Sequence, residues 1–321
     1  MSEGIGAKSR GAAKRGGATR EWPSVGVIIP TRDRPAMLAR AIDSVSIQDY
    51  PGRLRMIIVY DQAEPDYMLA RSGERPLMVL VNWRTPGLAG ARNTGILALD
   101  TELVAFCDDD DTWAPDKLRR QVETLGNAEF GTCAMEVEYA DRITPRLAGI
   151  SLVGVTDLVR SRMAMLHASS FLIRRSSLVN ADQLGLVAED APGSQNEDWD
   201  LLLRAAKRGA IRHVDEPLVR VAWGRTSYFA YEYDTKVASL RWMMERHPEI
   251  ARSDIGAARV YGQLACWSAA NGDKESALQY ARQAVRSNWR EPRAAIALAA
   301  ATGVVKVENV LSALHKRGRG I

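Results

Sequence analysis

The sequence predicts an α/β fold with a mostly parallel central sheet, followed by a small α-helical region. Short apolar runs typical of strands alternate with segments of helical periodicity over the first half of the chain. Strands that alternate with helices are joined by right-handed crossovers, which place the strands side by side in parallel. Past residue 235 the composition changes to Ala-rich helix.

The first predicted strand covers residues 25–29 and ends in the polar segment 30–35. A helix is predicted next, because apolar residues recur on one face of the following segment. We expect Pro35 in its first turn, with Thr31 or Asp33 as its cap. The apolar face consists of Met37, Leu38, Ala41, Ile42 and Val45.

Polar residues follow three of the predicted strands. Thr31 follows the first strand, Asp61 the second and Asp108 the last. In open α/β sheets, ligands bind beyond the carboxyl ends of the strands, so we expect these residues to lie along one edge. The later strands are predicted at residues 56–60, 77–81 and 103–107. A helix is predicted from about residue 89, before the last of these strands.

Four consecutive aspartates, Asp108 to Asp111, follow directly on the strand 103–107. Carboxylate oxygens are the ligands that Mg²⁺ and Mn²⁺ prefer, often beside a phosphate. The alternative is a solvated loop, which is the usual meaning of a run of like charges. A helical pattern begins at Leu118, so the run joins a strand to a helix. This position favours a metal or phosphate site.

A glycine-rich segment, Gly87 to Gly95, predicts a loop and the start of a helix that carries Arg92. Glycine allows a close approach of backbone to ligand, and a helix N-terminus beside a cation favours an anion. Pairing of Arg92 with an exposed carboxylate is the alternative. The segment matches neither nucleotide-binding glycine pattern, the dinucleotide fingerprint or the P-loop.

The composition is that of an ordinary soluble protein, with 46% hydrophobic and 26% charged residues among 321. No apolar run approaches the ~18 residues of a spanning helix, and the N-terminus lacks the apolar core of a signal peptide. We therefore expect a cytoplasmic protein. The cysteines Cys107, Cys133 and Cys266 are far apart, which predicts burial rather than a zinc site or disulfides.

The formal net charge is +4, and much of the excess lies at the two ends of the chain. Residues 1–21 and 315–319 are basic and poor in large apolar residues, so we expect disordered tails. They lack interleaved aromatic residues, and we therefore predict no nucleic-acid partner. Peripheral contact with the inner membrane face is left open.

Five segments together resemble the successive signatures of family 2 glycosyltransferases, in that family's order. The resemblance covers residues 24–225 and implies the GT-A fold, a nucleotide-diphospho-sugar transferase αβα sandwich. It also implies an inverting transfer of sugar from a nucleotide-sugar donor to an acceptor hydroxyl, with Mn²⁺ or Mg²⁺ bound. The segments are Val27–Pro35, Ser44–Pro51, Gly90–Gly95, Phe106–Leu118 and Asn196–Arg204.

The same resemblance implies roles for individual residues. Asp198 corresponds to the catalytic base, and Asp110 to the metal ligand. Gln62 stands where the family commonly has an aspartate, which leaves the nucleotide base open. The residues predicted to bind the nucleotide-sugar are Pro30, Thr31, Arg32, Asp61, Arg92, Asp108 and Asp109.

These roles agree with the chemistry of glycosyl transfer. A divalent cation stabilises the charge that develops on a nucleoside diphosphate leaving group. A carboxylate on the opposite side of the sugar can take the proton of the attacking hydroxyl. The alternative for Glu197 and Asp198 is a purely structural one, since carboxylates are favoured in the first turn of a helix.

The predicted domains are a tail at 1–22, a GT-A domain at 23–234 and a helical region at 235–321. The pattern at 262–284 resembles one tetratricopeptide-like helix pair, which cannot bury both of its faces alone. We expect this pair to pack on the catalytic domain or to form a homodimer contact.

The acceptor class stays open at this stage, between a glycan, a lipid-linked sugar and a small molecule, as does the pathway. Synthesis of cell-surface glycan or glycolipid is the reading we favour. Two other classes of function are also left open. One is an inactive scaffold that acts through its helical region, and the other is a nucleotidyltransferase.

Overall fold

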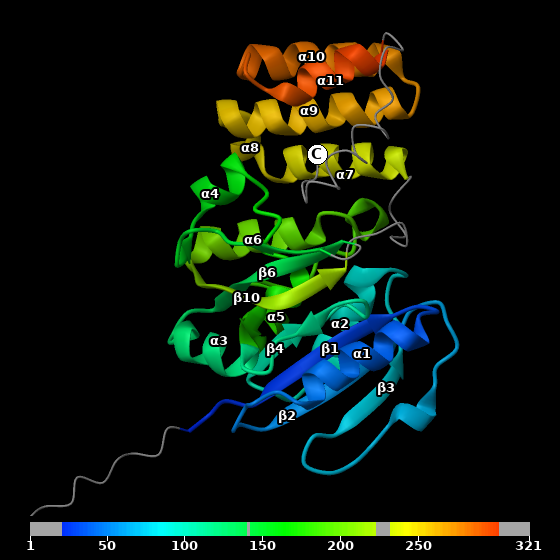
Figure 1. Cartoon of the computed structure of the whole chain (residues 1–321), viewed down its shortest axis with the longest axis vertical. Coiled ribbons are helices and arrows are strands. Elements are labelled where there is room, and N and C mark those ends of the chain that lie inside the picture. Colours follow the sequence, from blue (N-terminus) through cyan, green and yellow to red (C-terminus); the bar gives the residue numbers. More distant parts are fainter. Residues whose placement is uncertain (1–20, 140–141, 223–231, 302–321) are drawn as a thin grey trace, which may run out of the picture.

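The computed structural model describes residues 21–139, 142–222 and 232–301. Nearly all of the predicted tail at 1–22, and all of 315–319, lie outside these ranges. Within them the protein is built on one continuous sheet of ten strands, with a stack of helices at one end (Figure 1).

Strands and helices alternate in the first half of the chain, as predicted. β1 is longer than predicted and continues to Thr31. A short strand that was not predicted separates the aspartate run from the next helix. The elements are β1 (Val25–Thr31), α1 (Pro35–Ser46), β2 (Leu54–Tyr60), η1 (Tyr67–Leu69), β3 (Leu77–Val81), α2 (Leu88–Ala98), β4 (Leu103–Phe106), β5 (Thr112–Trp113) and α3 (Lys117–Leu125).

The second half of the chain completes the sheet and then becomes helical. Its elements are β6 (Phe130–Tyr139), β7 (Arg142–Arg146), β8 (Leu152–Val153), α4 (Val155–Arg160), η2 (Ala168–Ser170), β9 (Leu172–Arg174), α5 (Arg175–Val179), η3 (Pro192–Ser194), α6 (Glu197–Arg208), β10 (Ile211–Ala222), α7 (Tyr233–Arg246), α8 (Pro248–Arg252), α9 (Asp254–Ala270), α10 (Lys274–Ser287) and α11 (Pro292–Ala301).

The longest strand pairings are parallel. β1 pairs along its whole length with β2, and its first four residues pair with β4. β3 extends the parallel set beyond β2. β9 lies antiparallel between β4 and β6, and β6 forms a further parallel pairing with β10. The order β3-β2-β1-β4-β9-β6-β10-β5 confirms the predicted mostly parallel α/β sheet.

Helices cover both faces of the sheet, which makes an αβα sandwich. Every residue of β1 is buried, and its side chains alternate between two apolar clusters. Val27 and Ile29 pack in the cluster that contains Leu38 of α1, whereas Ile28 packs with Ile96 of α2. The three cysteines are buried and free, in agreement with the prediction.

The start of α1 differs from the prediction in its cap. Arg34 occupies the cap position and makes no side-chain capping bond, while Pro35 lies in the first turn as expected. Thr31 does not cap the helix, because it belongs to β1 and the cap position is Arg34; its hydroxyl donates to Asp109 instead. Asp33 has a positive φ of 53°, so it belongs to the turn that leads into the helix.

The helices α7 to α11 confirm the predicted helical region. In Figure 1 they stack beyond α6, at the end of the molecule opposite β1 to β3. α9 packs against α10 and α11 on one side and against α7, α8 and α4 on the other. None of the helices in the described ranges is long and apolar enough to cross a bilayer.

Candidate active site

The carboxyl ends of β1 and β4 bring the first group of predicted residues together. The Thr31 hydroxyl, at the end of β1, donates to Asp109 Oδ2 at 2.7 Å. Arg34 Nη1 lies 3.2 Å from Asp109 Oδ1 and 2.8 Å from Asp110 Oδ2. Arg34 therefore holds two members of the aspartate run, a contact that the sequence did not predict. Pro30 lies inside the buried strand, and Arg32 is exposed beside it.

Arg92 links the aspartate run to the start of α6. Its side chain is 2% exposed, with Nη2 2.7 Å from Asp108 Oδ1 and Nη1 2.5 Å from Glu197 Oε1. Burial, reinforced by the neighbouring Asp198, raises the pKa of Glu197 to about 7 despite Arg92. Arg92 thus lies in the site, with its guanidinium committed to carboxylates. Its predicted contact with the nucleotide-sugar stays a prediction.

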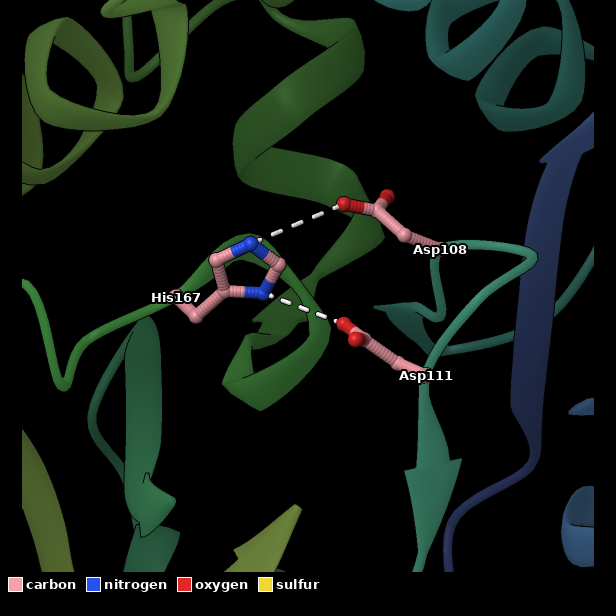
Figure 2. A group of neighbouring side chains, drawn as sticks. All are labelled: Asp108, Asp111 and His167. Carbon is pink, nitrogen blue, oxygen red and sulfur yellow. Dashed lines mark ion pairs between the residues drawn. The ribbon is translucent and has the colours of Figure 1, made fainter. Parts of the chain in front are cut away.

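His167 lies between Asp108 and Asp111, with one ring nitrogen toward each carboxylate (Figure 2). Burial alone would lower the pKa of His167, but Asp111 and Asp108 outweigh it and raise the pKa to about 9. The imidazole is therefore protonated at neutral pH and acts as a cation. Ser169 completes this cluster, because its hydroxyl donates to Asp111 Oδ2 at 2.5 Å.

The predicted base, Asp198, is 9% exposed at the start of α6. Arg162 Nη2 donates to both of its carboxylate oxygens at 2.9 Å. Burial would raise the pKa of Asp198, but Arg162 and His167 outweigh burial and lower it. A carboxylate held in this way is ionised, which a base requires, and Arg162 weakens its affinity for a proton.

Asp61 lies at the end of β2, apart from the aspartate run. Its carboxylate accepts hydrogen bonds from Asn82 Nδ2 at 2.8 Å, Gln62 Nε2 at 3.1 Å and the Gly87 amide at 3.0 Å. Gln62 thus contacts Asp61 directly at the position where the family commonly has an aspartate. The predicted contact between Asp61 and the nucleotide base is not tested by these bonds.

The carboxylates of the aspartate run fit a divalent cation. Burial and the charges of Asp111 and Asp108 raise the pKa of Asp110 to about 7, although Arg34 acts in the opposite direction. Asp111 Oδ1 is buried and has no hydrogen-bond partner within the described residues. Clustered carboxylates with an oxygen that makes no hydrogen bond are suitable ligands for a hard cation such as Mg²⁺ or Mn²⁺.

Two arrangements could hold such an ion. Ligand atoms of Asp108, Asp111 and His167 lie within 4.8 Å of one another, but His167 would have to lose its proton. Asp110 was predicted from sequence, and its side chain is 30% exposed at the rim of the site. A donor phosphate therefore reaches Asp110 more easily than Asp111, which is 1% exposed.

The glycines of α2 have a packing role that the sequence did not predict. A side chain at Gly90 would place Cβ 1.8 Å from the carbonyl oxygen of Thr85, and one at Gly95 would collide with Ile28. These glycines let α2 approach its own preceding loop and β1, while the predicted close approach of a ligand stays a prediction. Because α2 carries Arg92, this close packing determines the distance of Arg92 from the sheet.

Sequence reasoning missed Arg34, Arg162 and His167. Arg34 stands within the first motif, so its position was a usable signal. His167 is one of only four histidines and precedes a short strand, which is a weaker signal. Nothing in the sequence pattern distinguishes Arg162, because its contact with Asp198 spans 36 residues.

Comparison with known sequences identifies relatives of this chain. The model of "Glycosyl transferase family 2" matches residues 26–178. The amylovoran biosynthesis glycosyltransferase AmsB of Erwinia amylovora is 23% identical over 256 residues, covering 74% of this chain and 82% of AmsB. The succinoglycan biosynthesis protein ExoW of Rhizobium meliloti is 26% identical over 310 residues, covering 83% of this chain and 94% of ExoW.

Solved structures share the fold. S. aureus TarS (residues 1–349, in complex with UDP-GlcNAc) has a TM-score of 0.58 at 14% identity, and the match covers 92% of both chains. The mannosyltransferase PcManGT of Pyrobaculum calidifontis, in complex with GDP-Man and Mn²⁺, has a TM-score of 0.53 at 18% identity. That match covers 89% of this chain and 88% of PcManGT. The fold is therefore of the GT-A type.

Proposed function

Because the chain is a family 2 glycosyltransferase, we propose that it transfers a sugar with inversion from a nucleotide-diphosphate sugar to an acceptor hydroxyl, with a divalent cation bound. The observation that carries this proposal is the convergence of Asp108, Asp110 and Asp198 at the carboxyl edge of the parallel strands. Arg34 holds Asp110 and Arg162 holds Asp198. The charges of Arg92 and His167 act on both Asp108 and Asp198.

In this proposal the donor lies along the ends of β1, β2 and β4. Asp61 accepts a hydrogen bond from the nucleotide base, and Thr31, Arg32 and Pro30 line the nucleoside. Asp108 faces the ribose, and Asp109 also contacts the nucleotide-sugar. Asp110 holds Mn²⁺ or Mg²⁺, which when bound offsets the charge of the donor diphosphate. The complexes of TarS with UDP-GlcNAc and of PcManGT with GDP-Man support a nucleotide-sugar donor.

Asp198 acts as the base in the proposed reaction. The acceptor oxygen forms a bond to the anomeric carbon while the bond from that carbon to the phosphate oxygen breaks. Asp198 takes the proton of the acceptor hydroxyl, and the nucleoside diphosphate leaves with the electron pair. Attack opposite the leaving group inverts the configuration. Arg162 keeps Asp198 ionised until the acceptor arrives.

The names of the relatives bear on the pathway. AmsB and ExoW are named for the biosynthesis of amylovoran and succinoglycan. We propose that this chain likewise serves surface polysaccharide synthesis, with the GT-A domain at 23–234 and the helical region at 235–321. Cytoplasmic location, peripheral membrane contact and a homodimer through the helical region are parts of the same proposal.

Calorimetry of purified protein against nucleoside diphosphates and nucleotide sugars, with and without Mn²⁺, tests the donor assignment. We expect metal-dependent binding of one nucleotide class. Asp110→Ala should abolish the metal dependence, whereas Asp198→Asn should retain binding and lose at least about a hundredfold in turnover. Normal turnover by both variants would refute the assignment of these residues, and absence of nucleotide binding would refute the donor class.

A further inference from the structure

Arginine side chains gather where α6 meets the C-terminal helices. Arg162 extends from the segment after α4 to Asp198. Arg259 of α9 has its guanidinium carbon 6.0 Å from the ring centre of Trp199, the residue next to Asp198. Arg293 of α11 pairs with Glu291 through Nη1 at 2.7 Å. We call Arg162, Arg259 and Arg293 the junction arginines.

Close backbone packing fixes the junction arginines. A side chain at Gly256 would place Cβ 2.6 Å from the carbonyl oxygen of Val159 in α4, so α9 lies directly against α4. A side chain at Gly262 would likewise come within 2.8 Å of Arg293 Cβ. Because α9 is held on both sides, the backbone of Arg259 has a defined position between α4 and α11.

Arg259 has no carboxylate partner among the residues that the structure describes. Its Nη1 atom is buried without a hydrogen-bond partner, as is Nε of Arg293. Burial, together with the charges of Arg293 and Arg162, outweighs the opposite effect of Glu291 and lowers the pKa of Arg259 to about 10. A half-buried guanidinium close to other guanidinium groups and without an ion-pair partner destabilises a fold. Such a group in a native structure needs an explanation, and an anionic ligand that pairs with it provides one.

We propose that the acceptor carries an anionic group, a phosphate or a carboxylate, that binds between the junction arginines. This inference rests on the proposed function, since it concerns the acceptor of the same reaction. Guanidinium groups bind both kinds of anion through paired hydrogen bonds. The Arg162 side chain is 37% exposed, so an anion can reach it from solvent.

The position of the anion connects binding with reaction. Arg162 contacts Asp198, so an anion at Arg162 brings the rest of the acceptor alongside the carboxylate that acts as base. The anion also competes with Asp198 for the Arg162 guanidinium. An acceptor with the anion in place thus frees Asp198, whereas water alone leaves the ion pair intact. This arrangement favours transfer to the acceptor over hydrolysis of the donor.

Calorimetric titration with inorganic phosphate, and separately with glucuronate, tests the proposal in the absence of donor. We expect one of the two to bind the wild type and to bind Arg259→Gln at least about tenfold more weakly. The exposed Arg282 of α10 provides the matched control, because Arg282→Gln removes the same charge from the same helical region. The better ligand tells whether the acceptor anion is a phosphate or a carboxylate.

Two further measurements separate this proposal from its premises. The melting temperature of Arg259→Gln without anion should equal or exceed that of the wild type, since an unpaired charge is removed, so lost binding would not reflect unfolding. Asp110→Ala should retain anion binding even where it loses metal-dependent nucleotide binding. Binding of neither anion, or equal binding by Arg259→Gln, would overturn the anion site while leaving the proposed donor chemistry standing.

Discussion

Arg92 shows how much of this site depends on one side chain. The guanidinium is buried between Asp108 and Glu197, and it also lies 5.5 Å from the centre of the Phe106 ring. Buried carboxylates are costly without a cation, and removing one partner leaves the others uncompensated. Arg92 is therefore needed for stability as well as for the position of the site residues.

Replacing Arg92 with Met tests this dependence. We expect the free energy of unfolding at neutral pH to fall by about 3–5 kcal/mol, because Asp108 and Glu197 are left buried and close together. Urea denaturation measures the change. The control is Arg53→Met, since Arg53 and its partner Asp100 are 50% and 58% exposed and their pairing should contribute little. Equal effects of the two substitutions would contradict the assignment.

The sequence predicted which residues meet at the site better than it predicted their partners. Asp108 and Asp198 lie within recognisable motifs, so their presence at the sheet edge could be predicted. The pairing of Arg92 with Glu197 joins residues 105 positions apart, and no local pattern encodes such a contact. The same holds for His167, whose protonation depends on carboxylates contributed by a distant loop.

At the scale of elements, α2 is placed by its glycines. Gly90 lies against the backbone of Thr85 and Gly95 against Ile28 of β1, so the helix sits closer to the sheet than side chains would allow. α2 carries Arg92 on its buried face. The distance between helix and sheet therefore determines whether Arg92 reaches Asp108.

Gly90→Ala should shift this helix. The new Cβ would lie 1.8 Å from a carbonyl oxygen, which cannot rotate away as a side chain could. We expect a loss of about 3 kcal/mol in the free energy of unfolding, measured in urea, together with weaker nucleotide binding. Gly154→Ala is the control, because the nearest atom to its Cβ would be 3.7 Å away. Retention of full stability by Gly90→Ala would show that the loop yields.

The strands that could be predicted are those with strong local patterns. β1, β2 and β3 combine β-branched composition with clear turns, and their predicted ranges agree with the structure to within a few residues. β9 spans only Leu172–Arg174, yet it joins the two halves of the sheet by pairing with both β4 and β6. Three residues are too few to show the alternation of a strand, so β9 could not be predicted from sequence. Its conformation depends on tertiary contacts.

At the scale of the whole molecule, the helical end is tied to the catalytic end through buried charge. Asp200 of α6 is fully buried, and its carboxylate accepts from Arg204 Nε at 2.8 Å and Arg246 Nε at 2.6 Å. It also lies 2.9 Å from His247 Nε2. Arg246 and His247 stand at the end of α7, so one carboxylate joins the helix that carries the proposed base to the helical stack.

Asp200→Asn should loosen that connection. Burial would raise the pKa of Asp200, but His247, Arg204 and Arg246 outweigh burial and lower the pKa to about 2. Because the folded pKa lies below the unfolded one, the stabilisation is present above about pH 4 and is lost as the pH falls toward 2. We expect Asp200→Asn to lose about 2 kcal/mol at neutral pH.

Denaturation profiles between pH 2 and 7, with hydrogen exchange at neutral pH, check this prediction. The difference in the free energy of unfolding between wild type and Asp200→Asn should close as the pH falls from about 4 toward 2. Exchange should accelerate in α7 to α11 more than in β1 to β4, because the substitution acts on the contact between the two ends. A constant gap at every pH would contradict the role given to the Asp200 charge. Uniform acceleration would mean that Asp200 supports the fold without coupling its two ends.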